Sequence, residues 1–228
     1  MLQPVDLFDY KAWKHADLFD DVTHVWDVLP RIGDYVISHL EPGIHGTVME
    51  GAFLEGDDIF IGAGTVVEPG AFIRGPAIIG CNTEVRQGAY IRGTVLVGDD
   101  CVVGHTTEMK NSVMLDGAKA GHFAYIGDSI LGRNVNLGAG TKLANLKINN
   151  SEVIIRHDGE THQTGLRKFG AILGDHVELG CNSVSSPGTI IGPRTLVYPN
   201  ASVAGVIPGD AFVKVKQNQQ IHPHRARE

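Results

Sequence analysis

The sequence predicts a mainly β fold, a parallel β-helix of hexapeptide repeats with a short N-terminal helical segment and one inserted loop. Ten consecutive positions six residues apart are aliphatic or Met, and the positions four residues after them are small or β-branched in nine of ten cases. Large side chains alternating with small ones fill the narrow interior of a three-sided coil. The aliphatic series is Ile61, Val67, Ile73, Ile79, Val85, Ile91, Val97, Val103, Met109 and Leu115.

Residues 1–40 do not follow this period and are predicted to form a helical appendage. Apolar residues recur there at spacings of three to five, between Phe8 and Leu29. This pattern predicts one or two short amphipathic helices that end near Pro30 and Gly33. The open end of a β-helix exposes unpaired strand edges. We therefore expect the appendage to cover that end or to pack on a neighbouring subunit.

The β-helix is predicted to span residues 41–216, followed by a C-terminal tail over residues 217–228. Its aliphatic series changes phase within the segment KAGHFAY, residues 119–125, and then resumes at Ile126. After one interruption it continues to about residue 207.

That interruption is the inserted loop, residues 144–170. Val153, Ile154 and Ile155 are followed there by an Asp158-Gly159 pair, which is typical of a hairpin turn. Excursions from a regular scaffold often carry function.

Composition and charge narrow the class of protein. The net charge of −7 argues against a nucleic-acid-binding protein. The N-terminus lacks the features of a signal peptide, and no apolar run is long enough to cross a membrane. The three cysteines form no C-x-x-C pair, which favours a reducing compartment. We therefore expect a cytoplasmic protein without nucleic-acid or membrane partners, in which Cys101 packs in the core.

Outward-facing cations recur at coil spacing. Arg74, Arg92 and Lys110 each follow an aliphatic position and lie eighteen residues apart. Three hexapeptides make one coil, and stacked parallel strands lie about 4.8 Å apart, so these side chains should form one column. Like charges at this spacing repel. Either a carboxylate such as Glu108 compensates them in a structural ladder, or the column binds a phosphate. Residues 86–168 carry a net charge of +2, whereas residues 1–85 carry −10. An anionic small molecule is therefore expected to bind within residues 86–168.

His122 is the candidate general base. It lies in the phase change, twelve residues after Lys110 and three before Tyr125. Imidazole side chains titrate near neutral pH and can remove a proton there. The alternative is an ordinary surface histidine. A zinc site is a further alternative, because His122, His157 and His162 could supply three imidazoles, as in the trimeric γ-class carbonic anhydrases. Two of these lie in the inserted loop, where the repeat fixes no geometry, and we expect no metal.

Three motifs between Gly104 and Asn145 carry a resemblance to a known family: EMK, KAGH-x-x-Y-x-GD and NVN-x-GAGT. Together they resemble the acetyltransferase domain of the bifunctional N-acetylglucosamine-1-phosphate uridyltransferase/glucosamine-1-phosphate N-acetyltransferase family. Similarity extends, with gaps, from about Gly88 to Lys216. The resemblance implies a left-handed β-helix and a homotrimer with active sites between subunits. It also implies transfer of an acetyl group from acetyl-CoA to the amine of glucosamine 1-phosphate.

The resemblance implies roles for single residues. His122 would be the base that deprotonates the sugar amine, and backbone N–H groups near Ala139 would hold the oxyanion. Lys168 would close the site from the far side of the loop. The implied substrate contacts are Arg92, Lys110, Tyr125, Asn136 and Lys168, and the implied acetyl-CoA contacts are Ala139, Asn145, Cys181, Pro199 and Lys216.

The acetyl-CoA side departs from the family pattern at four positions. Leu146 follows Asn145 where the family has Tyr, Cys181 aligns with a serine, and Lys216 replaces an arginine. Pro199 aligns with a backbone-amide contact, although proline has no N–H to donate.

Two functional hypotheses follow. The preferred one is an acetyl-CoA-dependent N-acetyltransferase that acts on an amino-sugar 1-phosphate in nucleotide-sugar biosynthesis. The alternative is a non-catalytic trimerisation or regulatory module that assembles with a separate nucleotidyltransferase. Residues 1–40 are too short for a uridyltransferase domain, so we expect the acetyl-transfer part without that domain.

Overall fold

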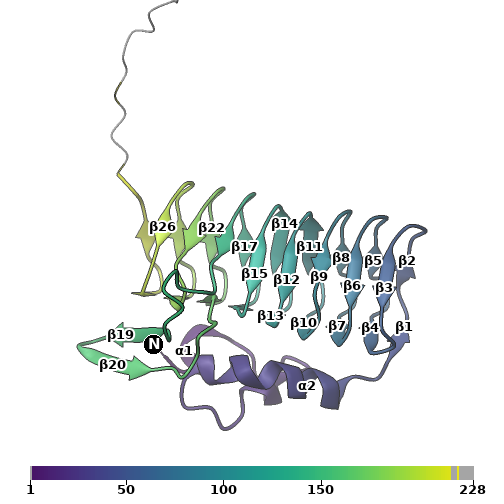
Figure 1. The fold of residues 1–228 in the computed structure, drawn as a ribbon, viewed down its shortest axis with the longest axis horizontal. Helices are drawn as coiled ribbons and strands as arrows, with labels where there is room; N and C mark the ends of the chain where they lie inside the picture. The colour runs from purple at the N-terminus through teal and green to yellow at the C-terminus, as the bar shows by residue number, and fades with distance from the viewer. Residues whose placement is uncertain (1, 217–219, 221–228) are drawn as a thin grey trace, which may run out of the picture.

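The computed structural model describes residues 2–216 and 220, so the predicted tail over residues 217–228 lies outside the described residues except at 220. The main body is a parallel β-helix whose coils stack along one axis (Figure 1). This arrangement confirms the predicted β-helix of hexapeptide repeats.

Three parallel sheets form its sides. Sheet A consists of β1 (Gly43–Ile44), β4 (Ile59–Ile61), β7 (Ala77–Ile79), β10 (Val95–Val97), β13 (Ser112–Met114), β16 (Ile130–Leu131), β21 (Ala171–Leu173), β24 (Thr189–Ile191) and β27 (Val206–Ile207). Sheet B consists of β2 (Thr47–Val48), β5 (Val66–Val67), β8 (Glu84–Val85), β11 (Val102–His105), β14 (Lys119–His122), β17 (Asn136–Leu137), β22 (Glu178–Leu179), β25 (Leu196–Val197) and β28 (Phe212–Val213). Sheet C consists of β3 (Phe53–Glu55), β6 (Phe72–Arg74), β9 (Tyr90–Ile91), β12 (Glu108–Lys110), β15 (Tyr125–Gly127), β18 (Lys142–Leu143), β23 (Val184–Ser185) and β26 (Ser202–Val203).

The interior follows the predicted aliphatic series with one exception. Nine of its ten members are buried in the core of the coil, but Leu115 belongs to a second cluster on the outer face of sheet A. Met114 takes the interior place instead, as the register partner of Val97. Cys101 packs in the interior as predicted, and burial raises the pKa of its thiol to about 12.

The change of phase was predicted in the wrong place. Met114, Ala120 and Ile126 all lie in the core at intervals of six, so the segment over residues 119–125 keeps the period. The interval shortens to five between Met109 and Met114, at the corner from sheet C to sheet A. Only one residue at that corner has a positive φ, Asn111 (φ 41°), whereas the equivalent corner of the preceding coil has two such residues.

The N-terminal segment contains α1 (Pro4–Leu7), the 3₁₀ helices η1 (Ala16–Phe19) and η2 (Val25–Arg31), and α2 (Ile32–His39). η2 ends at Arg31, next to the predicted end at Pro30, but the predicted end at Gly33 is wrong, because α2 continues to His39. Proline is tolerated just before and within the first turn of a helix. Pro30 precedes the N-cap Arg31 and therefore leads into α2 rather than ending it.

This segment covers neither end of the coil, so the first of the two arrangements that we expected is wrong. It lies along the outer face of sheet A (Figure 1). The outward side chains of that sheet are apolar on successive coils, and such a face is stable only under a second layer. The outward residues buried beneath the segment and the inserted loop include Ile78, Leu96, Val113, Ile130, Ile172 and Ile190.

The inserted loop contains the predicted hairpin, formed by β19 (Ile154–His157) and β20 (Glu160–Gln163). Its turn residues Asp158 (φ 52°) and Gly159 (φ 81°) both have positive φ, the geometry for which an Asp-Gly pair is favoured. The base of the loop packs on the N-terminal segment, where Phe169 contacts Trp26 with ring centroids 6.4 Å apart. Among the described residues, no helix has the length and apolarity needed to span a membrane.

Candidate active site

The predicted cation column is present on the outer face of sheet C. Strand register places Arg74 beside Glu55 and stacks β6, β9 and β12 in order. Each cation has its own carboxylate. Arg74 lies 2.8 Å from Glu55, and Arg92 lies 2.6 Å from the predicted partner Glu108. These pairs relieve the repulsion along the column, although exposed ion pairs contribute little to stability.

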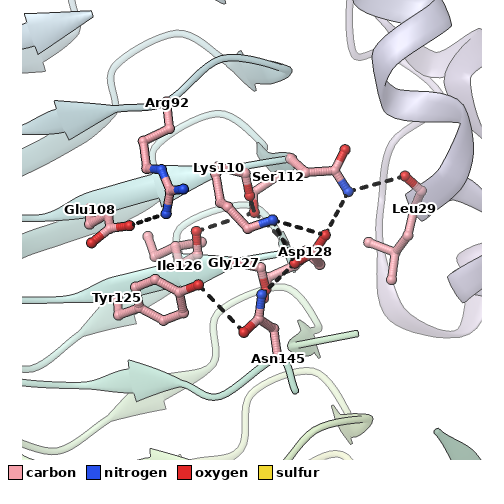
Figure 2. Close-up of polar contacts among 12 residues, drawn as sticks. Leu29, Arg92, Glu108, Lys110, Ser112, Tyr125, Ile126, Gly127, Asp128 and Asn145 are labelled. Carbon is pink, nitrogen blue, oxygen red and sulfur yellow. Dashed lines mark hydrogen bonds and ion pairs between the residues drawn. The ribbon is translucent and has the colours of Figure 1, made fainter. Parts of the chain in front are cut away.

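The third cation, Lys110, has a different environment. Its Nζ lies 3.1 Å from Oδ2 of Asp128, and the two side chains are only 18% and 7% exposed. Asp128 also accepts a hydrogen bond from the side-chain amide of Asn145 (Figure 2) and another from that of Asn111. We call Lys110, Asn111, Asp128 and Asn145 the Asp128 cluster. It connects Lys110, a predicted contact of the sugar phosphate, with Asn145, a predicted contact of acetyl-CoA.

Tyr125 extends this cluster. Its hydroxyl donates to Oδ1 of Asn145 over 3.4 Å. Burial, with the nearby carboxylates of Glu108 and Asp128, raises the pKa of the Tyr125 phenol. The hydroxyl therefore stays protonated and remains a donor across the physiological pH range.

Gly127 follows Lys110 in the column, as its register partner on β15. A Cβ at this position would lie 2.7 Å from the Tyr125 hydroxyl and 2.8 Å from Asn145 Nδ2. The missing side chain is thus what allows a phenol and an amide to lie directly beside the Lys110 position.

His122 is the last residue of β14 in sheet B, at the corner that connects sheet B to sheet C. Backbone hydrogen bonds connect this corner from coil to coil: the Gly140 N–H donates to the His122 carbonyl over 3.0 Å, and the Asn182 N–H donates to the Ala139 carbonyl over 2.8 Å. In the next coil the Asn200 N–H donates to the Cys181 carbonyl over 2.8 Å.

His122, Ala139 and Cys181 therefore occupy equivalent corner positions on three successive coils, and Pro199 lies at the corner of the next coil. The His122 side chain is exposed, and its ring centroid lies 6.4 Å from that of Phe123. Within residues 2–216, no hydrogen bond connects the imidazole to the Asp128 cluster.

The other predicted residues are more dispersed. Asn136 is exposed on sheet B, between Lys119 and Glu178 in register. Lys168 is exposed but adjoins the cluster, because it forms a β-bridge with Leu146. Lys216 is exposed, three residues beyond the last strand of sheet B.

Asp128 was missed by the sequence reasoning, although a signal was present. It belongs to the Gly-Asp pair of the KAGH-x-x-Y-x-GD motif and lies eighteen residues after Lys110. The eighteen-residue spacing in the sequence therefore leads from Lys110 to a carboxylate, although the shortened coil places Gly127 in the column and Asp128 next to it.

The three histidines of the zinc alternative do not come together. The His162 ring contacts His24 and Trp26 of the N-terminal segment, whereas His122 lies at the corner from sheet B to sheet C. Across residues 2–216 and 220, no group of three or more His, Cys, Asp or Glu side chains is arranged to hold a metal ion.

Comparison with known proteins identifies relatives of the whole coil. The family model described as "GMPPB C-terminal domain" matches residues 73–194. The bifunctional sugar-1-phosphate nucleotidylyltransferase/acetyltransferase of Sulfurisphaera tokodaii is 40% identical over 113 residues, 50% of this chain and 28% of that protein. Bifunctional protein GlmU of Methanococcus aeolicus is 33% identical over 207 residues, 91% of this chain and 50% of that protein.

GlmU of Methanococcus maripaludis strain C7 is 36% identical over the same shares of the two chains. The chain thus spans about half the length of the GlmU proteins that it matches. It belongs to the family of the GMPPB C-terminal domain, and its fold is a parallel β-helix of hexapeptide repeats.

Proposed function

We propose that this protein is an acetyl-CoA-dependent N-acetyltransferase that acts on an amino-sugar 1-phosphate, such as glucosamine 1-phosphate, in nucleotide-sugar biosynthesis. The observation that carries this proposal is the Asp128 cluster, which brings together Lys110 and Asn145 beside the Tyr125 hydroxyl. The relatives support it, because they include a bifunctional nucleotidylyltransferase/acetyltransferase and several GlmU proteins.

In the proposed reaction, the sugar amine attacks the thioester carbonyl of acetyl-CoA. His122 removes the proton from the nitrogen, and backbone N–H groups near Ala139 stabilise the oxyanion of the tetrahedral intermediate. When the intermediate collapses, the C–S bond breaks and CoA leaves as the thiolate, which takes up a proton. The products are an N-acetyl sugar phosphate and free CoA.

The sugar phosphate would bind to Lys110 and Arg92. A lysine ammonium has three N–H donors and an arginine guanidinium has five. Their contacts with Asp128 and Glu108 therefore leave donors for phosphate oxygens. Tyr125 and Asn136 would contact the sugar, and Lys168 would approach from the loop.

Acetyl-CoA would bind along the corner that carries Ala139, Cys181 and Pro199, with Asn145 and Lys216 as further contacts. Pro199 can supply shape but no hydrogen bond through its nitrogen. The resemblance also implies a homotrimer with the active sites between subunits, which we adopt as part of this proposal.

A screen for CoA release tests the proposal. Purified protein is mixed with acetyl-CoA and a panel of amino-sugar phosphates, and the free thiol is measured over time. We expect release with glucosamine 1-phosphate or a related hexosamine 1-phosphate. N-acetylglucosamine 1-phosphate is the matched control, since it has no free amine. No release with any member of the panel, by folded and assembled protein, would overturn the proposal.

A non-catalytic trimerisation or regulatory module is the second candidate. It is favoured by Pro199 on the acetyl-CoA side and by the carboxylate partner of every cation in the column. It predicts that acetyl-CoA produces no heat in calorimetry and that the protein co-purifies with a separate nucleotidyltransferase. Binding of acetyl-CoA together with turnover would exclude it.

A further inference from the structure

Asp128 holds side chains that we assign to two different substrates. Oδ2 of Asp128 lies 3.1 Å from Lys110 Nζ and also accepts the hydrogen bond from Asn145 Nδ2 (Figure 2). Oδ1 accepts a hydrogen bond from Asn111 Nδ2 over 3.0 Å and one from Lys110 Nζ over 3.5 Å. One carboxylate oxygen therefore contacts both Lys110, which we propose binds the sugar phosphate, and Asn145, which we propose binds acetyl-CoA.

The position of this carboxylate is fixed by the backbone. The Asp128 N–H donates to the Lys110 carbonyl over 3.1 Å, and the Gly170 N–H donates to the Asp128 carbonyl over 2.8 Å. With φ at 48°, Asp128 forms the short corner from sheet C to sheet A. Coil stacking and the return of the inserted loop thus hold it in place independently of the side chains it contacts.

The carboxylate also determines how the Asn145 amide is oriented. A carboxylate only accepts hydrogen bonds, so the amide nitrogen must face Asp128. The amide oxygen then faces the Tyr125 hydroxyl, which donates to it over 3.4 Å. Lys110 Nζ contacts both carboxylate oxygens, Oδ2 at 3.1 Å and Oδ1 at 3.5 Å, so at least one of its three N–H groups remains for a phosphate.

We propose that Asp128 is a positioning residue that couples the two substrate sites, by fixing the Lys110 ammonium for the sugar phosphate and the Asn145 amide for acetyl-CoA. This inference rests on the proposed function and deepens it. Asp128 itself touches neither substrate.

The test is Asp128→Asn, which keeps the shape of the side chain and tolerates the positive φ. The change removes the charge and introduces a donor that faces Lys110 and Asn145. Since charge-assisted hydrogen bonds are the stronger kind, we expect kcat to fall and the KM for acetyl-CoA to rise, each by at least about tenfold. The KM for the sugar phosphate should rise by less, because Lys110 keeps its charge and loses its neutralising partner.

Asp210→Asn is the matched control. Asp210 also has a positive φ, 55°, and its carboxylate pairs with a cation, Arg194, over 2.6 Å. Neither residue is assigned a substrate contact. We expect kcat and both KM values of this variant to stay within about twofold of the wild type, the range of a neutral change.

The outcomes separate this inference from the proposed function. If the wild type releases CoA and Asp128→Asn changes only the melting temperature, the inference is wrong and the function stands. If the wild type does not turn over, the function is wrong, and calorimetry with acetyl-CoA decides the inference. Binding at least about tenfold weaker by Asp128→Asn then supports it, and equal binding overturns it. A wild type that does not bind acetyl-CoA overturns both.

Discussion

The outer face of sheet C carries cations that follow the repeat and one cation, Lys110, that lies where the repeat is interrupted. Arg74 and Arg92 follow the repeat and pair with carboxylates on the surface, as a structural ladder would. Lys110 instead lies where the coil shortens, and there its partner is the buried Asp128. The column thus begins as a ladder and ends at Lys110, where we propose that an anion binds through the donors that remain.

The exposed position of His122 leads to the first residue-scale prediction. His122→Ala removes the proposed base without disturbing packing, because the side chain is exposed. General-base catalysis contributes about 10² to 10⁴ in rate, so kcat should fall by that range while the KM for the sugar phosphate changes little. Steady-state kinetics measures both constants. An unchanged kcat would show that the base lies elsewhere.

His15 gives a prediction about stability and pH. Burial, with the nearby Lys14 charge, lowers the pKa of His15 to about 4 in the folded state, against about 6.5 in an unfolded chain. The unfolded state therefore binds the proton more readily between these values, and stability is lost as pH falls from about 6.5 to about 4. His15 Nδ1 lies 3.2 Å from the Tyr35 hydroxyl, which donates to Asp17. The Nδ1–H is therefore the donor to Tyr35.

His15→Asn keeps a donor for Tyr35 but removes the titration. We expect the melting temperature of the variant to depend less on pH between 6.5 and 4 than that of the wild type. His176→Asn is the control, because His176 is exposed and its φ of 60° suits asparagine. Equal pH slopes for His15→Asn and the wild type would contradict the linkage.

At the scale of elements, the hexapeptide period predicted the coil well because its interior admits only one alternation of large and small side chains. The N-terminal segment was placed wrongly because the period describes inward positions only. The signal for its location lay in the residues directly before Ile79, Val97 and Met114. These residues are Ile78, Leu96 and Val113, which are apolar on an outward face and therefore require a cover.

The same packing predicts a large effect for one aromatic residue. Trp26 is 2% exposed, stacks on His24 with centroids 4.4 Å apart and contacts Phe169 of the inserted loop. Trp26→Ala should lower the free energy of unfolding by about 3–5 kcal/mol, as measured by denaturant titration. Ile37→Ala on α2, where Ile37 is 63% exposed, should change it by less than about 0.5 kcal/mol. Similar effects at the two positions would contradict this packing.

The elements of the site were only partly predictable from sequence. Arg92, Lys110 and Tyr125 could be placed on one sheet face from spacing, since the period fixes which residues point outward. Asn145 could not, because its contact with Asp128 depends on a coil that is one residue shorter than the period. Such a shortening is decided by the backbone of a single corner residue, here Asp128 itself with φ at 48°, and the six-residue period does not predict it.

At the scale of the whole molecule, the predicted assembly is a homotrimer. Each chain has a mass of 24.5 kDa. Sedimentation equilibrium or light scattering should therefore give a particle of three times this mass, with no dependence on protein concentration over the working range. A stable monomer that carries full activity would contradict active sites between subunits.

The central claim concerns the chemistry that the whole molecule performs. Its most direct test is mass-spectrometric analysis of the sugar product after incubation of the protein with acetyl-CoA and glucosamine 1-phosphate or galactosamine 1-phosphate. The account predicts a sugar phosphate that carries one acetyl group on its nitrogen, formed by the wild type and strongly reduced with His122→Ala. An assembled wild-type protein that binds both substrates and yields no acetylated sugar would contradict it.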